Sequence, residues 1–403
     1  MTTDKNNIVT RETPPSFYIV AGEASGDRHG ALLASELQAA SKESKCYGVG
    51  GPFLLAAGQD QLFDLAKHAV VGLTDVIVNY RKFSRFFQQI LKDIEDKNPS
   101  ALILIDYPGF NLRLAKAVRR IRPKLPIIYY ISPQVWAWKQ HRSRTMAKVI
   151  DLLLVIFKFE ETWFADREPK LKVKWVGHPL LDRWQGLADR DPADFRIRQI
   201  TLMPGSRPQE ITRHLPVLLE TARRLWHENK QLCFNILAVD NKAEKLIMDM
   251  IVELHYETLH AEVLNSYQLT HLCRSDLAIV ASGSATVECC LAEVPMLVIY
   301  KVNPITFAVG KAVTQVPYLA MVNILAGKKI VPEFLQEKAD PEYLFQAIRR
   351  IQQESRWSET MKASLKEVST QLGTPGASQR SATAVLELLA SRKTTGSYTN
   401  PGK

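Results

Sequence analysis

The sequence predicts an α/β protein made of two doubly wound domains, each a parallel sheet covered by helices. The chain has 403 residues, more than one hydrophobic core usually organises. With 46% hydrophobic and 23% charged residues, its composition is that of ordinary globular proteins. Short β-branched or aliphatic runs alternate with amphipathic helical stretches almost throughout, which is typical of parallel sheets.

The candidate strands are nine short apolar runs, too many for one compact half. They are Phe17–Ala21, Ala101–Ile105, Ile127–Ile131, Leu152–Ile156, Val173–Val176, Ile200–Met203, Leu232–Leu237, Leu277–Ala281 and Met296–Tyr300. The Asp- and Arg-rich stretch Leu187–Arg198 lies between the fifth and the sixth and is the natural linker. We therefore expect one domain over residues 14–186 and a second over 187–340, facing each other across a cleft. Helices over 341–392 are expected to pack back on either domain or to be exchanged in a dimer, and 393–403 to be a disordered tail.

Charge and hydropathy restrict the partners. Lys plus Arg exceeds Asp plus Glu by 52 − 42 = 10, which implies attraction to phosphates, nucleic acid or an acidic membrane surface. The polar opening Met1–Ser16 lacks a secretory signal, so export is not expected. The longest apolar stretch, Leu277–Leu297, is interrupted by glycine, glutamates and proline, so we expect no transmembrane span.

Neither a metal nor a cofactor is expected. The five cysteines contain no C-x-x-C pair and are expected to be buried, reduced thiols: Cys46, Cys233, Cys273, Cys289 and Cys290. The D-x-D motif Asp189–Asp191 lies in the linker rather than at a strand end.

The first strand runs directly into G-E-A-S-G-D-R-H-G, residues 22–30. Small residues let the backbone approach a ligand, and Ser25 or Asp27 can cap a helix whose amides attract anions. The motif is not G-x-G-x-x-G, which disfavours a dinucleotide site. A capped turn without a ligand remains the alternative.

This string resembles the amino-terminal signature of the lipid-A-disaccharide synthases, a family of glycosyltransferases with the GT-B fold. The resemblance implies a GT-B architecture of two Rossmann-like domains. It also implies a substrate-binding role for Gly22, Glu23, Ser25, Gly26, Asp27 and His29.

The strand Ala101–Ile105 places Asp106 at its carboxyl end, where a general base could reach an attacking hydroxyl. The alternative is that Asp106 caps the helix starting near Asn111. The family often has I-D-x-P-D-F-N here, and by this resemblance Asp106 matches its proposed base. Gly109 replaces the second Asp, which leaves Asp106 as the sole candidate in this loop.

After the third strand, S-P-Q-V-W-A-W resembles the family's S-P-x-V-W-A-W motif and implies that Trp136 contacts substrate; core packing is the alternative. V-G-H-P at residues 176–179 also matches the family. We interpret His178 as a satisfied polar side chain rather than a functional group.

In the second half, a strand delivers Arg207, whose guanidinium can hold two phosphate oxygens of a departing diphosphate. A surface salt bridge with Glu210 is the alternative. A second small-residue loop opens a helix at residues 282–288, where amides and hydroxyls would hold diphosphate and Glu288 would accept from ribose hydroxyls. The two loops resemble the family's L-P-G-S-R-x-x-E and S-G-T-A-T-x-E donor motifs, with Ser284 replacing Thr. The implied donor-site residues are Gly205, Ser206, Arg207, Glu210, Ser282, Gly283, Ser284, Ala285, Thr286 and Glu288.

Two later elements resemble the family's P-N-I-L-A-G and V-P-E-F-L-Q. The resemblance implies a catalytic role for Asn323 at the donor phosphates and substrate contact by Gln336, whereas a helix-capping role for Asn323 is the simpler alternative.

Apolar residues at spacings of four and three from Val76 to Ile94 form one helical face beside Arg81, Lys82 and Arg85. Such a face can lie on an anionic bilayer, although core helices show the same periodicity.

The resemblance implies an inverting transfer in which Asp106 deprotonates the acceptor hydroxyl and UDP leaves toward Arg207 and residues 282–286. The implied substrates are UDP-2,3-diacylglucosamine and 2,3-diacylglucosamine 1-phosphate (lipid X), for lipid A biosynthesis. The implied location is cytoplasmic, peripheral to the inner membrane, with a homodimer as an option. The alternatives are another GT-B enzyme such as a UDP-N-acetylglucosamine epimerase, and a basic nucleic-acid-binding protein. Scattered cations argue against nucleic acid.

Overall fold

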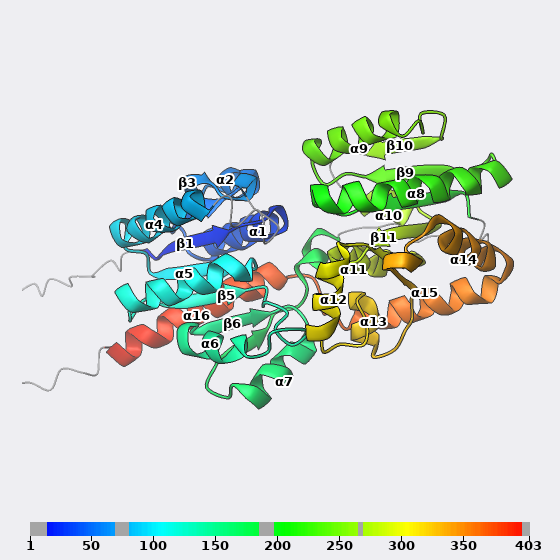
Figure 1. The fold of residues 1–403 in the computed structure, drawn as a ribbon. Coiled ribbons are helices and arrows are strands. Elements are labelled where there is room, and N and C mark those ends of the chain that lie inside the picture. Colours follow the sequence, from blue (N-terminus) through cyan, green and yellow to red (C-terminus); the bar gives the residue numbers. More distant parts are fainter. Residues whose placement is uncertain (1–13, 69–79, 185–196, 265–268, 397–403) are drawn as a thin grey trace, which may run out of the picture. The chain divides into compact units, whose positions relative to one another are not determined.

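The computed structural model describes residues 14–68, 80–184, 197–264 and 269–396. These residues form two compact units. Unit 1 consists of residues up to 135, 140–179 and those from 376 onward; unit 2 consists of 136–139 and 180–375. Figure 1 shows in each unit a sheet with helices on both faces.

The sheet of unit 1 has seven parallel strands in the order β3-β2-β1-β4-β5-β6-β7. Their bounds are β1 Ser16–Ala21, β2 Lys45–Gly50, β3 Asp60–Asp64, β4 Ala101–Ile105, β5 Ile127–Tyr130, β6 Leu152–Val155 and β7 Val173–Trp175. Its helices are α1 Ala24–Ala40, α2 Pro52–Ala56, α4 Tyr80–Lys97, α5 Pro108–Ile121, α6 Arg142–Val149, α7 Lys158–Arg167 and α16 Ala377–Gly396. Short 3₁₀ turns lie at Ala66–His68 and, across the boundary to unit 2, at Pro179–Arg183.

The sheet of unit 2 has six parallel strands in the order β10-β9-β8-β11-β12-β13. Their bounds are β8 Gln199–Met203, β9 Cys233–Leu237, β10 Ala261–Leu264, β11 Leu277–Ala281, β12 Met296–Tyr300 and β13 Glu333–Leu335. The helices are α8 Pro208–Glu228, α9 Asn241–Glu253, α10 Leu269–Cys273, α11 Ser284–Leu291, α12 Pro304–Val313, α13 Met321–Ala326, α14 Pro341–Gln353 and α15 Ser355–Thr370, with a 3₁₀ turn at Gln336–Lys338. The prediction of two doubly wound α/β units is thereby confirmed.

All nine expected strands are present, within two residues at each end. Four further strands were not predicted. Three of them, β3, β10 and β13, are edge strands, and β2 lies next to an edge. Each is short or carries polar and glycine residues, as in K-C-Y-G-V-G and D-Q-L-F-D, so none of them stands out in the sequence as an apolar run.

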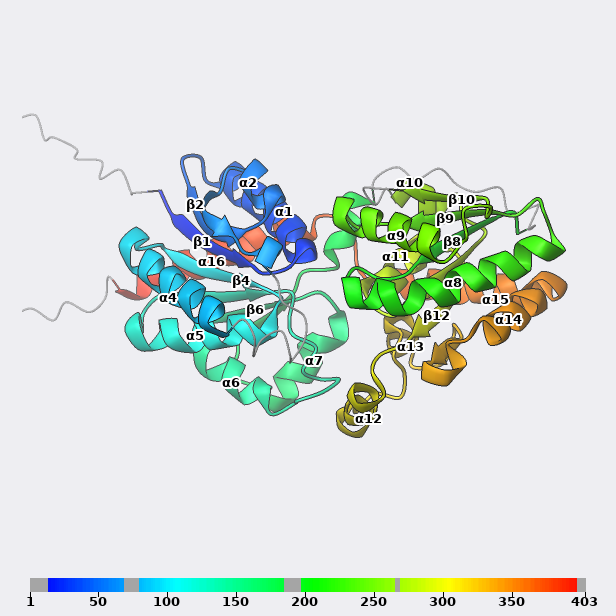
Figure 2. The same ribbon diagram turned by 45° about the horizontal axis from the view of Figure 1, so that its top comes forward.

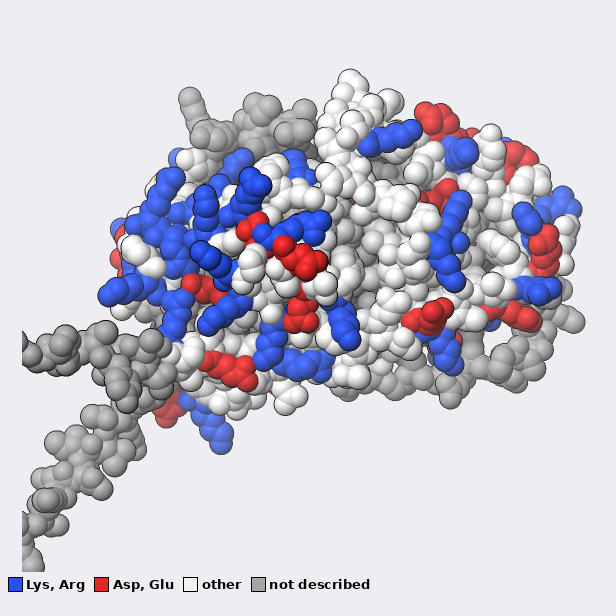
Figure 3. Space-filling view, turned by 90° about the horizontal axis from the view of Figure 1, so that it is seen from below, with Lys and Arg blue, Asp and Glu red and all other residues white. Residues whose placement is uncertain are grey.

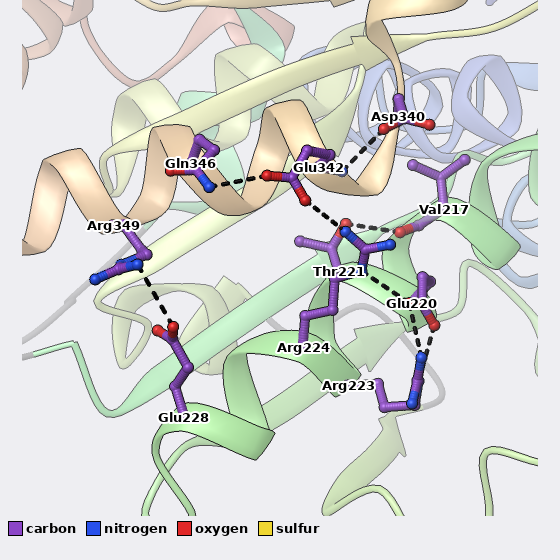
Figure 4. A network of polar contacts seen from close by, with 10 residues as sticks. All are labelled: Val217, Glu220, Thr221, Arg223, Arg224, Glu228, Asp340, Glu342, Gln346 and Arg349. Atoms are coloured by element: carbon purple, nitrogen blue, oxygen red, sulfur yellow. Dashed lines mark hydrogen bonds and ion pairs between the residues drawn. The ribbon is translucent and has the colours of Figure 1, made fainter.

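Ion pairs connect the long helices α8 and α14 at the surface of unit 2 (Figure 4). Arg224 contacts both Glu220 and Glu342 at 2.8 and 2.7 Å, and Arg349 contacts Glu228 at 3.6 Å. These partly exposed pairs contribute little individually; the buried apolar faces of both helices, including Leu344 and Ile348, supply the packing.

The C-terminal helix α16 belongs to unit 1 of its own chain, where it packs on α1 and β6. Arg380 donates to the Val176 carbonyl at 2.7 Å, and Glu387 pairs with Lys174 at 2.9 Å. The helix ends at Gly396, so its last residues lie inside the segment 393–403 that was expected to be a tail; 397–403 lie outside the described residues.

Helix α4 contains the described part of the segment expected to meet lipid. Ile90 and Ile94 have 0% exposure in the core of unit 1, and Phe87 packs against that core. This half of the apolar face therefore packs on its own sheet, which corrects the membrane interpretation for these residues. Val76 and the rest of 69–79 lie outside the described residues.

No helix among the described residues is long and apolar enough to cross a membrane. Figure 3 shows lysine and arginine side chains gathered over the unit 1 part of one face. Cys46, Cys289 and Cys290 are buried thiols, as expected, but Cys233 is exposed. Burial raises the pKa of Cys46 to about 11 and that of Cys290 to about 12, so these thiols are not nucleophiles.

Candidate functional site

Each sheet has one point where the strand order reverses, and the predicted motifs lie at these two points. In unit 1 the reversal is between β1 and β4, and in unit 2 between β8 and β11. In doubly wound sheets, ligands bind at such a point, beyond the carboxyl ends of the strands. Each unit therefore carries one candidate half-site.

In unit 1 the register pairs Ala21 with Ile105, so Gly22 and Asp106 follow paired residues. A Cβ on Gly22 would lie 2.2 Å from the ring of Tyr107, so only glycine lets this ring lie across the β1 loop. The loops that sequence analysis treated as separate motifs are thus in contact.

The backbone at the carboxyl ends of β4 and β5 is held in an unusual conformation. Asp106, Tyr107 and Ile131 have φ angles of 45°, 47° and 62°, in the left-handed region that such residues rarely adopt. Conformations of this kind cost on the order of 1–3 kcal/mol each and persist where the surroundings enforce them, often at functional sites.

The surroundings of Asp106 do enforce its position. The Asn111 amide donates to the carbonyls of Ile105 at 3.1 Å and of Asp106 at 2.8 Å, and the Tyr129 hydroxyl donates to the Asp106 carbonyl. The Asp106 amide donates to the Tyr130 carbonyl at 3.0 Å. Helix α5 begins at Pro108 with Tyr107 as its N-cap, so Asp106 does not cap it. The structure therefore fixes the backbone that carries this partly exposed carboxylate.

Asp27 has a different role from the one predicted. Its carboxylate is 1% exposed and accepts from the backbone amides of Gly51 at 2.8 Å, Phe53 at 2.9 Å and Leu54 at 3.0 Å. It therefore caps α2, whereas Glu23 is the N-cap of α1 and makes no side-chain cap bond. Three backbone donors hold both oxygens of Asp27, so we assign it to positioning the loop rather than to substrate.

The remaining residues of this motif divide by exposure. Ser25 is exposed, Glu23 and His29 are half-buried, and Gly22 and Gly26 are buried. Buried His178 has its pKa lowered to about 3, first by burial and second by the charge of His29. It is a neutral interior side chain, in agreement with its interpretation as structural.

Trp136 is 5% exposed and belongs by its contacts to unit 2. Core packing, the alternative for this residue, agrees with that burial. Its neighbour Trp138 is 42% exposed, with the Lys139 ammonium 4.4 Å from the ring centre.

In unit 2 the donor loops start side by side, because Met203 at the end of β8 pairs with Val280 near the end of β11. Gly205 has φ of +124°, and a Cβ there would lie 2.6 Å from Glu210 Oε2. That oxygen accepts from the Ser206 amide at 3.1 Å, while Glu210 Oε1 lies 3.3 Å from Arg207. The salt bridge considered as an alternative is thus present, and it holds a 41% exposed guanidinium above the loop.

The second donor loop leads from β11 into α11. Gly283 and Ser284 are exposed, Ala285 and Glu288 are half-buried, and Thr286 is buried and donates to the Gly283 carbonyl at 2.8 Å. Ser282 donates to the Leu319 carbonyl at 3.2 Å. The hydroxyls of Ser282 and Thr286 thus brace the loop, and its exposed residues are Gly283 and Ser284.

His214 connects the loops after β8 and β12 and was missed by sequence analysis. Its Nε2 accepts from the Lys301 amide at 2.9 Å, so Nδ1 carries the proton and donates to the Pro204 carbonyl at 2.7 Å. Burial lowers its pKa, which keeps the ring neutral. The signal was weak, because one histidine on an amphipathic helix does not reveal which distant amides it binds.

The side chain of Asn323 is buried and hydrogen-bonded within unit 2. It has 0% exposure; its amide donates to the Val331 carbonyl at 2.9 Å and to Glu333 at 2.8 Å, and its carbonyl accepts from the amides of Ile330 and Val331. All four hydrogen-bonding positions are occupied, so no contact to a donor phosphate remains. The predicted catalytic role is corrected to a structural one.

Gln336 is likewise occupied by the backbone. It is 5% exposed, and its side chain both accepts from and donates to Val302, at 2.8 and 3.0 Å. It holds the end of β12 in place, and substrate contact through its side chain is not supported.

The chain is similar to proteins of one family. The family model described as lipid-A-disaccharide synthetase matches residues 17–388. The lipid-A-disaccharide synthase of Geobacter sulfurreducens is 36% identical over 387 residues, which cover 94% of this chain and 99% of that protein. The lipid-A-disaccharide synthase 1 of Legionella pneumophila strain Paris is 40% identical over 329 residues, 79% of this chain and 83% of that one.

A solved structure with the same fold is that of S. aureus MnaA with UDP. It has a TM-score of 0.66 at 14% identity and covers 93% of this chain and 97% of its own. At this identity the likeness shows the fold alone.

Proposed function

Since the chain belongs to the lipid-A-disaccharide synthetase family and is a glycosyltransferase, we propose that it condenses UDP-2,3-diacylglucosamine with 2,3-diacylglucosamine 1-phosphate. The products are a β-1,6-linked disaccharide 1-phosphate and UDP. Family membership favours this reaction over an epimerase and over a nucleic-acid-binding protein.

Asp106 is the proposed general base. The observation that carries the proposal is the arrangement at the β1/β4 reversal, where bonds from Asn111 and Tyr129 hold the Asp106 backbone in a left-handed conformation. A carboxylate fixed there can accept the proton of the 6-hydroxyl as that oxygen attacks the anomeric carbon from the face opposite UDP. Inversion at that carbon gives the β-linkage.

The donor half of the reaction is proposed for unit 2. Negative charge grows on the diphosphate as the glycosidic bond to UDP breaks. The Arg207 guanidinium and the backbone amides at the start of α11 are the groups that would stabilise it. Arg207 would exchange its contact with Glu210 for phosphate, because an exposed ion pair is weak. Catalysis requires both substrates to be bound in one ternary complex.

Because both substrates carry acyl chains, we propose that the protein works peripherally at the cytoplasmic face of the inner membrane. The excess of ten positive charges supports attraction to anionic lipid.

The test uses purified protein with both acylated substrates and detects the product by mass spectrometry. Asp106→Asn should lower product formation by about 10²- to 10⁴-fold, the usual contribution of a general base, and leave UDP affinity unchanged. Asp166→Asn, which changes an exposed carboxylate on α7 of the same unit, should behave as the wild-type protein. Turnover of Asp106→Asn close to wild type would exclude this residue as the base.

A further inference from the structure

Helix α12, Pro304–Val313, is an apolar helix with no buried residue. Ile305, Val309 and Val313 are 75%, 58% and 42% exposed. They recur every four residues and so form one stripe along the helix. Figure 2 shows α12 projecting from the rest of unit 2 on two connecting segments, and in Figure 3 the corresponding projection at the upper edge of the view is white. Contiguous exposed apolar surface of this kind marks an interaction site.

The charged residues nearest to α12 along the chain are all positive. No acidic residue occurs between Glu293 and Glu333, whereas this stretch contains Lys301, Lys311, Lys328 and Lys329. The last three of these lysines are exposed. An apolar stripe whose charged neighbours in the sequence are all positive complements a surface that is apolar inside and anionic outside.

A second exposed segment, residues 138–139, follows a residue that is hydrogen-bonded to the chain just after α12. The Gln315 amide, two residues beyond α12, donates to the Ala137 carbonyl at 2.9 Å. The next two residues are the 42% exposed Trp138 and the exposed Lys139. Tryptophan and lysine are the side chains that favour the headgroup region of a bilayer.

The length of α12 decides how it can meet a bilayer. Its ten residues span about 15 Å, whereas a helix that crosses the hydrocarbon core needs about 20 residues. A short helix with an apolar stripe and basic neighbours lies in the plane of the interface.

We propose that α12 is the element through which this protein docks on an anionic phospholipid surface, with Ile305, Val309 and Val313 inserted among the acyl chains and the lysines at the headgroups. The inference rests on the proposed function in one respect: acylated substrates require access to a membrane. It assigns the membrane contact to unit 2, whereas the described part of the α4 face is buried in unit 1.

The experiment is vesicle co-sedimentation of the full-length protein. One set of vesicles contains equimolar phosphatidylcholine and phosphatidylglycerol, and the other phosphatidylcholine alone. The wild-type protein should bind the anionic vesicles, and added salt should weaken that binding. Ile305→Ser/Val309→Ser should reduce the partition coefficient by about tenfold, since two exposed apolar side chains are lost from the interface. Lys311→Glu should also reduce it by about tenfold.

Helix α9, Asn241–Glu253, provides a matched control. Met248 and Val252 are 50% and 56% exposed and four residues apart, but Asp249 and Glu253 lie beside them. Met248→Ser/Val252→Ser should bind vesicles as the wild-type protein does. Because the α12 side chains are exposed, the α12 variants should keep the wild-type melting temperature.

Three results would overturn the assignment. In the first, the α12 double variant binds anionic vesicles as well as wild type. In the second, it changes the mass measured by light scattering without lipid, which would make α12 a contact between two copies of the chain. In the third, vesicle binding is unchanged but turnover of detergent-dispersed substrates is lost, which would make α12 a binding surface for substrate acyl chains. Vesicle binding through α12 without any product from the two substrates would refute the proposed function and leave the docking surface intact.

Discussion

At the scale of single residues, both half-sites depend on backbone conformations that few side chains tolerate. Asp106 and Tyr107 are left-handed next to the buried strand β4, and Gly205 is left-handed next to β8. Hydrogen bonds from Asn111 on α5 and Tyr129 on β5 hold Asp106 in this conformation. The backbone thus sets the places from which the candidate side chains project.

Gly205→Ala tests this dependence in unit 2. The new Cβ would lie 2.6 and 2.7 Å from atoms of Glu210, and φ of +124° is unfavourable for alanine. We expect UDP affinity to fall about tenfold or more, since relieving about 1–3 kcal/mol of strain moves the loop. Isothermal titration with UDP measures the change.

The control is Gly310→Ala. Nothing lies within 4 Å of a Cβ at this helical position, so UDP affinity should be that of the wild-type protein. A Gly205→Ala variant that binds UDP normally would show that the loop does not need this conformation.

The buried ring of His178 should make the stability of unit 1 depend on pH. Its pKa is about 3 in the folded state and about 6.5 when the chain is unfolded, so the unfolded state binds more protons between these values. His178 therefore does not lower the free energy of unfolding above pH 6.5. As the pH falls below 6.5, the free energy of unfolding decreases. At pH 5 the decrease should be about 2 kcal/mol, from about 1.4 kcal/mol per pKa unit.

Urea unfolding of unit 1 between pH 8 and pH 5 measures this effect. His178→Gln, which removes the titrating group, should lose less stability over the range than the wild-type protein. His141→Gln, an exposed histidine in the same unit, should follow the wild-type curve. Parallel curves for wild type and His178→Gln would contradict the assignment of a neutral buried ring.

At the scale of elements, side chains that looked functional in the sequence turn out to join secondary structures. Asp27 connects α1 to α2, His214 connects α8 to the loops after β8 and β12, and Asn323 connects α13 to β13. Glu333 completes the last connection by accepting from the amides of Leu319 and Ala320. These contacts keep the loops at the carboxyl ends of the strands in register.

Asn323→Ala distinguishes such a connection from catalysis. It would leave the Ile330 and Val331 amides and the Glu333 carboxylate without their buried partner, at a cost of about 2–4 kcal/mol. Denaturant unfolding of unit 2 measures the loss, while turnover of the folded protein should change less than about threefold.

Asn229→Ala removes a single exposed bond to the Gln231 amide and should cost less than about 1 kcal/mol. A hundredfold loss of turnover in Asn323→Ala at unchanged stability would restore the catalytic interpretation.

At the scale of the whole molecule, the chain does not divide into two consecutive halves. Unit 1 is completed by α16, which follows all of unit 2 in the sequence. Buried Val385 and the contacts of Arg380 and Arg392 with Val176 and Asp151 attach this helix. The end of the chain therefore contributes to the stability of its beginning.

A chain ending at Pro375 tests this arrangement. Unit 1 should unfold at lower denaturant concentration, and amides of α1 and β6 should lose protection from hydrogen exchange, because removal of α16 exposes their packed faces. Unit 2 should keep its protection. A chain ending at Gly396 serves as the control, and equal protection of unit 1 in both would show that α16 is dispensable.

The sequence alone determined the two α/β units and most of the strand-end loops that carry chemistry. This was possible because apolar runs and the small residues after them are local signals. It also proposed Asp106 and Arg207 as candidate site residues, by their place after buried strands and by family resemblance.

Tertiary structure decided which polar side chains form hydrogen bonds within the fold and which remain exposed. The Asp27 carboxylate is used by amides 24 to 27 residues away, and the ring of His214 by an amide 87 residues away. The edge strands, the packing of α16 on unit 1 and the exposure of α12 likewise depend on contacts between residues far apart in the sequence. A side chain's partners are set by distance in space, and a single sequence records only distance along the chain.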